Sequence, residues 1–248
     1  MSAMSTTSAT PDFAPALPHG ELQPVFPGVH LVTGTMKTVL MGAHWHFSRN
    51  MTVISSGREL TLVNTVRLDD AGLAALDALG TVTNIVRLGA LHGQDDAFYK
   101  HRHPKATYWA TAGVPPAPGI EADRPLVDDG AAPLPDASVF LFRQTKLPEA
   151  ILHLGREGGI LVACDALQNW LAPDAFFSDE SRAMMTQMGF FTPANIGPAW
   201  RQFNEPQGGD FERLMALDFR HVLPGHGSPL KDSAREAFGE RFAQVFAS

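Results

Sequence analysis

The stretch Glu59–Leu88, ELTLVNTVRLDDAGLAALDALGTVTNIVRL, decides the fold class because its hydrophobic period changes twice. It begins and ends with short apolar runs of the kind that form buried strands. Between these runs, three leucines recur on one helical face, Asp69 or Asp70 can cap the first turn, and Gly80 can end the helix. A strand, a helix and a strand in this order predict an α/β fold built in layers.

The flanking sequence continues this pattern in both directions. Upstream, runs at Val29–Thr33 and Met51–Ser55 predict strands, and the Gly-containing link after the second predicts a hairpin with the strand at 59–64. Residues 113–135, rich in Pro, Gly and Asp, predict a long surface connection. The remaining expected helices lie at Phe98–His103, Ser181–Met188, Phe211–Leu217 and Ser233–Phe246, and the remaining strands at Ala106–Ala110, Ser138–Arg143, Ala150–Leu154, Ile160–Cys164 and His221–Leu223.

The composition is that of one soluble α/β domain. Hydrophobic residues make up 44% of the 248 residues and charged residues 18%, so the chain can bury a full core. The formal net charge of −7 disfavours nucleic acid and anionic membrane surfaces as partners, because both require clustered Lys and Arg. No apolar run approaches the ~20 residues that span a bilayer.

The start of the chain predicts a tail. Residues 1–18 are rich in Ser, Thr, Ala and Pro and lack the basic and apolar regions of a signal peptide, so we expect a flexible tail there and a single domain over 19–248. One cysteine, Cys164, cannot form an internal disulfide, which favours a cytoplasmic location. A homodimer is expected only because two-fold dimers are the commonest assemblies.

Polar residues follow three of the predicted strands directly. They are the turn His92–Asp96, Asp165 and His226, and the loops at strand ends are where folds of this kind gather a site. Imidazole and carboxylate groups together suit Zn²⁺ or a related divalent ion. In a tight turn, His92, Gln94 and Asp96 can converge on one point. The pattern therefore predicts a metal centre at this edge, although His92 can also be a surface residue and Asp96 a helix cap.

The order of these motifs resembles the metallo-β-lactamase-fold hydrolases. Members of that superfamily carry H-x-H-x-D-H after a strand, a further His before a hairpin, an Asp closing a strand, and a late P-G-H-G. This chain has His92–Ala97 at the first place, Cys164–Leu167 at the third and Pro224–Gly227 at the fourth. The resemblance covers about residues 29–230 and implies a four-layer αββα sandwich.

The same resemblance implies a degenerate metal motif. Gln94 and Ala97 stand where the family has His, and no His lies near Thr145, where the third one is expected. The segments Arg49–Val53, Leu79–Gly80 and Pro104–Ala106 look like those of a divergent branch in which the metal motif is commonly altered. The ligands left for one divalent ion, zinc first, are His92, Asp96, Asp165 and His226.

Two functions remain open on this basis. The first is a metal-dependent hydrolase with one ion, acting on an ester, a thioester or a related small substrate, in which Asp96 or Asp95 orients the attacking water. The second is a non-catalytic member that binds a small molecule or a protein in the old cleft, with or without metal. An iron redox centre is disfavoured because the ligands for a second ion are missing. His44 and His46 precede a strand and are additional candidates for the site rim.

Overall fold

Seven strands form the largest β-sheet, and they follow one another across it in chain order. The computed structural model describes residues 13–40 and 42–246. The strands are β1 (Gln23–Phe26), β2 (Val29–Leu40), β3 (Ala43–Ser56), β4 (Glu59–Val63), β5 (Thr81–Arg87), β6 (Thr107–Thr111) and β7 (Arg124–Leu126). Strands β1 to β4 pair antiparallel, and β4 to β7 pair parallel.

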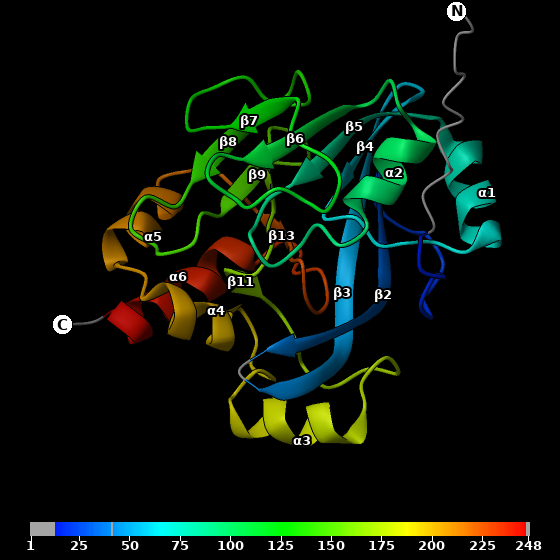
Figure 1. Cartoon of the computed structure of the whole chain (residues 1–248). Helices are drawn as coiled ribbons and strands as arrows, with labels where there is room; N and C mark the ends of the chain where they lie inside the picture. Colours follow the sequence, from blue (N-terminus) through cyan, green and yellow to red (C-terminus); the bar gives the residue numbers. More distant parts are fainter. Residues whose placement is uncertain (1–12, 41, 247–248) are drawn as a thin grey trace, which may run out of the picture.

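The β2–β3 hairpin is much longer than the sequence pattern predicts. It pairs continuously from Val29 opposite Ile54 to Leu40 opposite Ala43, and its far end runs past the other strands towards helix α3 (Asp179–Gln187) (Figure 1). The prediction was too short because residues 34–42 lack a clean alternation of polar and apolar side chains, and the alternation at 43–48 is brief. This extension forms one wall of the candidate site.

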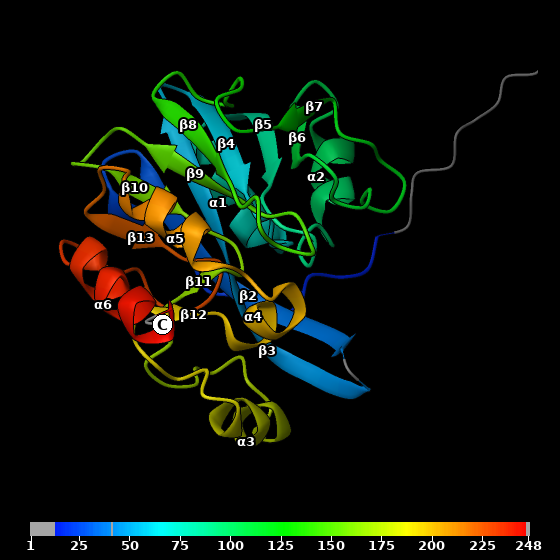
Figure 2. The same cartoon turned by 90° about the vertical axis from the view of Figure 1, so that its left-hand side faces the viewer.

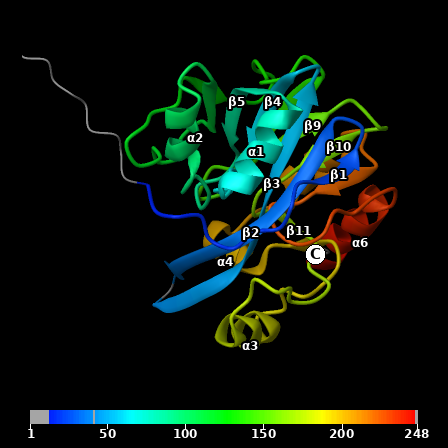
Figure 3. The same cartoon turned by 90° about the vertical axis from the view of Figure 1, so that its right-hand side faces the viewer.

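Two helices cover the outer face of this sheet, α1 (Asp70–Leu79) and α2 (Asp96–Arg102) (Figure 3). Helix α1 begins as predicted, because the Asp69 carboxylate accepts a hydrogen bond from the Gly72 N–H at 2.8 Å. Its buried leucines, Leu73 and Leu76, pack onto the apolar side chains of the sheet. The sequence prediction of this helix is confirmed.

A second, four-stranded sheet packs against the first. Its order is β13 (His221–Leu223), β10 (Ile160–Val162), β9 (Ala150–Leu154) and β8 (Ala137–Leu141), and only β13 and β10 are parallel. Helices α4 (Pro198–Asn204), α5 (Gly208–Met215) and α6 (Ala234–Phe246) lie on its outer side (Figure 2). A short two-stranded ladder joins β11 (Leu167–Gln168) to β12 (Asn195–Ile196).

Three apolar layers hold these elements together. One lies between the sheets, one between the large sheet and α1–α2, and one between the small sheet and α4–α6. The fold is therefore the four-layer αββα sandwich that the sequence predicts. Among the described residues, no helix is both long and apolar enough to cross a membrane.

Two sequence expectations need adjustment. Residues 13–18, assigned to the flexible tail, lie against the large sheet, where the Pro18 carbonyl accepts from both the N–H and the hydroxyl of Thr35. The tail prediction for 1–12 lies outside the described residues. The connection at 113–135 contains the edge strand β7, whose Pro125 is tolerated because an edge strand need not donate on both sides.

Candidate metal centre

Three of the predicted ligands meet at one edge of the sandwich. Asp165 and His226 follow the parallel neighbours β10 and β13, so the carboxyl ends of these strands bring them side by side, with 3.0 Å between Nε2 of His226 and Oδ1 of Asp165. His92, from the loop after β5, places its Nε2 3.1 Å from Nε2 of His226 and 3.6 Å from Oδ2 of Asp165. All three side chains are buried or nearly so.

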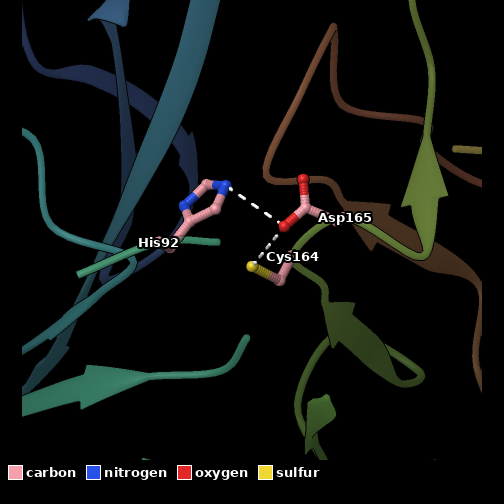
Figure 4. A group of neighbouring side chains, drawn as sticks. All are labelled: His92, Cys164 and Asp165. Carbon is pink, nitrogen blue, oxygen red and sulfur yellow. Dashed lines mark hydrogen bonds and ion pairs between the residues drawn. The ribbon is translucent and has the colours of Figure 1, made fainter. Parts of the chain in front are cut away.

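Cys164 adds a fourth donor that the sequence analysis did not include. Ligand atoms of His92, Cys164 and Asp165 all lie within 4.8 Å of one another, and Figure 4 shows both other side chains directed at the Asp165 carboxylate. The Cys164 Sγ is 3.4 Å from Oδ2 of Asp165. His92, Cys164 and Asp165 offer nitrogen, sulfur and oxygen donors of the kinds that zinc binds, and His226 adjoins this group through its contacts with Asp165 and His92.

The hydrogen bond behind His226 fixes how its ring faces the group. Nδ1 of His226 lies 2.9 Å from the Ser48 carbonyl oxygen, so Nδ1 carries the proton that is donated. The other ring nitrogen, Nε2, faces a carboxylate oxygen 3.0 Å away. A proton or a metal ion between these two atoms makes the contact favourable. A backbone carbonyl behind the ring is also how metal-bound histidines are commonly oriented.

The spacing of the donor atoms fits a shared ion. Ligands bound tetrahedrally at about 2.0–2.1 Å from zinc lie about 3.3 Å from one another. The contacts among His92, Asp165 and His226 measure 3.0, 3.1 and 3.6 Å. Although the two contacts of Asp165 end on different oxygens, these separations are close to those of ligands that share one divalent ion.

Burial and charge favour the metal-binding protonation states of His92 and Asp165 but disfavour that of Cys164. Burial lowers the pKa of His92 and outweighs the opposing effect of Asp165, so the ring stays neutral. Burial alone would raise the pKa of Asp165, but His92 and His226 together lower it below its usual range. Burial, followed by the nearby Asp165, raises the pKa of the Cys164 thiol. A metal would have to displace that proton for sulfur to bind.

Asp96 is not part of this group. Both of its oxygens accept hydrogen bonds from hydroxyl groups, at 2.5 Å from Thr65 and 2.8 Å from Tyr108. The side chain is completely buried at the start of α2, and burial raises its pKa. Through these two hydrogen bonds Asp96 fixes the start of α2. The geometry does not support its predicted roles as metal ligand and catalyst.

The neighbouring residues of the turn also point elsewhere. Asp95 forms an ion pair with Arg49 and accepts the Arg67 N–H at 2.8 Å, so its carboxylate is engaged away from the donor group. Gln94 is exposed and lines a different pocket. The convergence predicted for alternate residues of the turn does not occur, because the chain enters α2 at Asp96.

His44 and His46 lie on the side of β3 away from the donor group. Side chains alternate along the strand, so Trp45 and Phe47 face the site. His44 is exposed, and His46 lines an outer groove beside Glu180. The structure does not bring either histidine to the rim of the site.

Glu149 is a buried carboxyl group that the motif comparison overlooked. It directly precedes β9, close to the place where the third family His is absent, and its Oε1 accepts the Ala166 N–H at 2.6 Å. Burial, followed by the adjacent Asp165, raises its pKa. An acidic residue immediately before a strand that is apolar except for His153 was the available sequence signal.

The loop that carries His226 is held by close backbone contacts. Gly227 has a φ of +86°, and a Cβ there would lie 2.4 Å from the Asn169 backbone, so only glycine fits. Asn50 of β3 donates to the carbonyls of Pro224 and Gly227 at 3.0 and 2.7 Å. The position of His226 therefore depends on β3 as well as on β13.

A small apolar cavity of about 70 Å³ opens onto Asp165 and His226. Its walls are mostly apolar and include Trp45 and Phe47 of the long hairpin together with Trp170. Such walls exclude water from the donor group and leave room for a small apolar group beside it.

Comparison with known proteins shows the fold. No protein-family model and no curated protein matches the sequence. Among solved structures, the metallo-β-lactamase VMB-1 matches with a TM-score of 0.60 and 14% identity, over 92% of this chain and 98% of that one. The mono-zinc form of FIM-1 from Pseudomonas aeruginosa gives 0.56 and 15%, over 93% and 97%. The enzyme from Hirschia baltica gives 0.55 and 15%, over 90% and 97%. With the layered sheets described above, these matches establish that the chain has the metallo-β-lactamase fold.

Proposed function

We propose that the protein is a one-metal hydrolase that cleaves short-chain acyl esters or thioesters. The observation that carries this proposal is the cluster of His92, Cys164 and Asp165 with His226 beside it, of which Asp165 and His226 line an apolar cavity. A ligand group that is buried but adjoins a cavity is the arrangement expected of a catalytic rather than a purely structural ion.

The donor residues supply the chemistry by holding the ion. A divalent ion at this position lowers the pKa of a water molecule bound to it and polarises a carbonyl group. Ser48 keeps the His226 ring in the tautomer that leaves Nε2 free for the ion, and Asp165 contributes the negative charge. Since Asp95 and Asp96 are engaged elsewhere, this proposal assigns neither of them to the water.

The cavity limits the size of the acyl group. About 70 Å³ is small beside the roughly 300–1,000 Å³ of pockets that hold drug-sized ligands. Aromatic walls from Trp45, Phe47 and Trp170 favour an apolar group over a charged one. We therefore expect acetyl and propionyl compounds to be better substrates than long-chain ones.

A non-catalytic binding protein is the second candidate. It is favoured by the engagement of Asp95 with Arg49 and of Asp96 with Thr65 and Tyr108, which leaves no unpaired carboxylate of this turn for proton transfer. In that case the same cavity would hold a small apolar ligand without turnover.

The experiment combines metal analysis with an activity series. Protein purified without chelators should contain up to one zinc per chain and hydrolyse acetyl thioesters, and His226→Ala and Asp165→Asn should lose both properties. His44→Ala, an exposed histidine on the outer side of β3, is the matched control and should retain both. Zinc bound without hydrolysis of any acyl chain length supports the binding protein, and absence of zinc from wild type overturns the hydrolase.

A further inference from the structure

A second pocket lies between the N-terminal segment and the large sheet, near the metal centre but with no ligand residue in its lining. Its volume is about 310 Å³, and both basic and apolar side chains line it. We propose that this pocket binds a small organic oxyanion, namely a carboxylate attached to an apolar body.

Arg49 provides the central observation. Its side chain is only 4% exposed, and one nitrogen of the guanidinium, Nη2, is paired with Asp95. Among the residues that the structure describes, neither Nε nor Nη1 has a hydrogen-bond partner, although both are buried. Leaving a buried donor of a charged group unpaired is costly, so these two N–H groups need an acceptor, either a water molecule or an oxygen of a bound anion.

The charge around the pocket has the matching sign. Lys37, Arg49 and Arg67 line it together with a single carboxylate, Asp95. That carboxylate is already shared between the Arg49 side chain and the Arg67 backbone N–H. Asp95 therefore does not neutralise the positive charge of the pocket. This local excess contrasts with the formal net charge of −7 of the whole protein.

Arg67 is held in place by an aromatic side chain. Its guanidinium carbon lies 3.7 Å from the centroid of the Phe98 ring, a cation–π contact that keeps the group at the pocket wall. Within the described part of the chain its buried Nε has no acceptor either. Two arginines with unsatisfied donors in one pocket distinguish this place from an ordinary basic surface.

Apolar side chains complete the wall and indicate the kind of anion. Phe13 and Leu17 from the N-terminal segment face the pocket together with Phe98 and Val66. An inorganic anion would gain nothing from these groups, whereas the body of an aromatic or aliphatic carboxylate would bury apolar surface against them. Benzoate has both parts and is therefore the probe.

Binding should be measured by titrating benzoate into the full chain, with a chelator present so that the metal centre is empty. We expect one saturable site, an affinity for benzoate higher than that for inorganic phosphate, and a loss of about tenfold or more in Arg49→Gln because a charged hydrogen bond is removed. Lys37→Gln, at an exposed position, should weaken binding several-fold without affecting folding. Arg220→Gln, an exposed arginine outside the pocket, is the control.

The variants keep the proposal falsifiable. Should Arg49→Gln fail to fold, which thermal unfolding would show, Lys37→Gln and Arg67→Gln decide in its place. If the wild type shows no saturable binding of benzoate, the proposal is wrong, because water molecules or groups of the chain itself must then accept hydrogen bonds from the Arg49 side chain. Binding that is unaffected by the pocket variants, or that is lost in Asp165→Asn, overturns it as well, since the second result would place benzoate at the metal centre.

Discussion

Replacing Asn50 with alanine should detach the loop that carries His226. The Asn50 amide donates to the carbonyls of Pro224 and Gly227, and its oxygen accepts from the Thr33 hydroxyl at 2.8 Å. Three hydrogen bonds at a net value of about 1 kcal/mol each give a loss of about 3 kcal/mol in the free energy of unfolding. For a domain of this size, that loss lowers the melting temperature by roughly 6–12 °C.

The same change should weaken zinc binding, because residues that orient metal ligands typically contribute about 10–100-fold in affinity. Thermal unfolding followed by circular dichroism measures the first effect, and titration of zinc against a chelating indicator measures the second. Asn84→Ala is the matched control. Asn84 also forms buried and half-buried hydrogen bonds, including one from the Trp109 ring N–H at 2.9 Å, but on the far part of the large sheet. Equal zinc affinity in Asn50→Ala and wild type would refute the reasoning.

Three further predictions concern the centre and the fold. If the Cys164 sulfur binds the ion, cobalt-loaded protein shows a thiolate charge-transfer band that Cys164→Ser abolishes; a band that persists in the variant contradicts the assignment. Gly227→Ala should destabilise the fold by about 2–5 kcal/mol, because strain at positive φ adds to a backbone clash. Gly57→Ala, also at positive φ but with open space around it, should lose only about 1–2 kcal/mol, and equal melting temperatures for the two would rule out the clash. The hydrogen bond from Lys100, and after it the one from the Tyr108 N–H, lowers the pKa of Asp123. The ionised Asp123 carboxylate therefore stabilises the folded state above the ordinary pKa of about 4. This stabilisation is lost as the pH falls through the lower, folded-state value. Asp123→Asn should therefore flatten the acid limb of a plot of stability against pH, and an unchanged acid limb would show that this carboxylate does not contribute.

The layered fold was predictable because its strands and helices carry strong local periodicity. Helix α1 has its cap, its leucine face and its terminal glycine in one continuous segment, and the structure reproduces it. The long β2–β3 hairpin was not predictable in the same way. Its outer half owes its strand conformation to pairing and to contacts with α3, such as the bond from the His46 N–H to the Ser181 hydroxyl, and not to its own sequence.

The donor group was predictable in part. Asp165 and His226 were found because each directly follows a strand, and the parallel pairing of β10 with β13 then brings them together. Asp96 was included because the family motif has a ligand there, whereas its hydroxyl partners come from β6 and from the loop after β4, which no local pattern shows. Cys164 entered the sequence analysis only as a lone cysteine at the start of a motif; it is fully buried, and it also adjoins the centre.

Four consecutive residues of β3 serve four separate purposes. Phe47 walls the cavity, Ser48 orients His226, Arg49 reaches Asp95 and the second pocket, and Asn50 secures the loop after β13. A strand alternates its faces strictly, so one residue inserted or deleted just before this segment would exchange the faces and misplace all four at once. The unbroken pairing of β3 with β2 therefore sets the positions of the β3 residues that line both pockets.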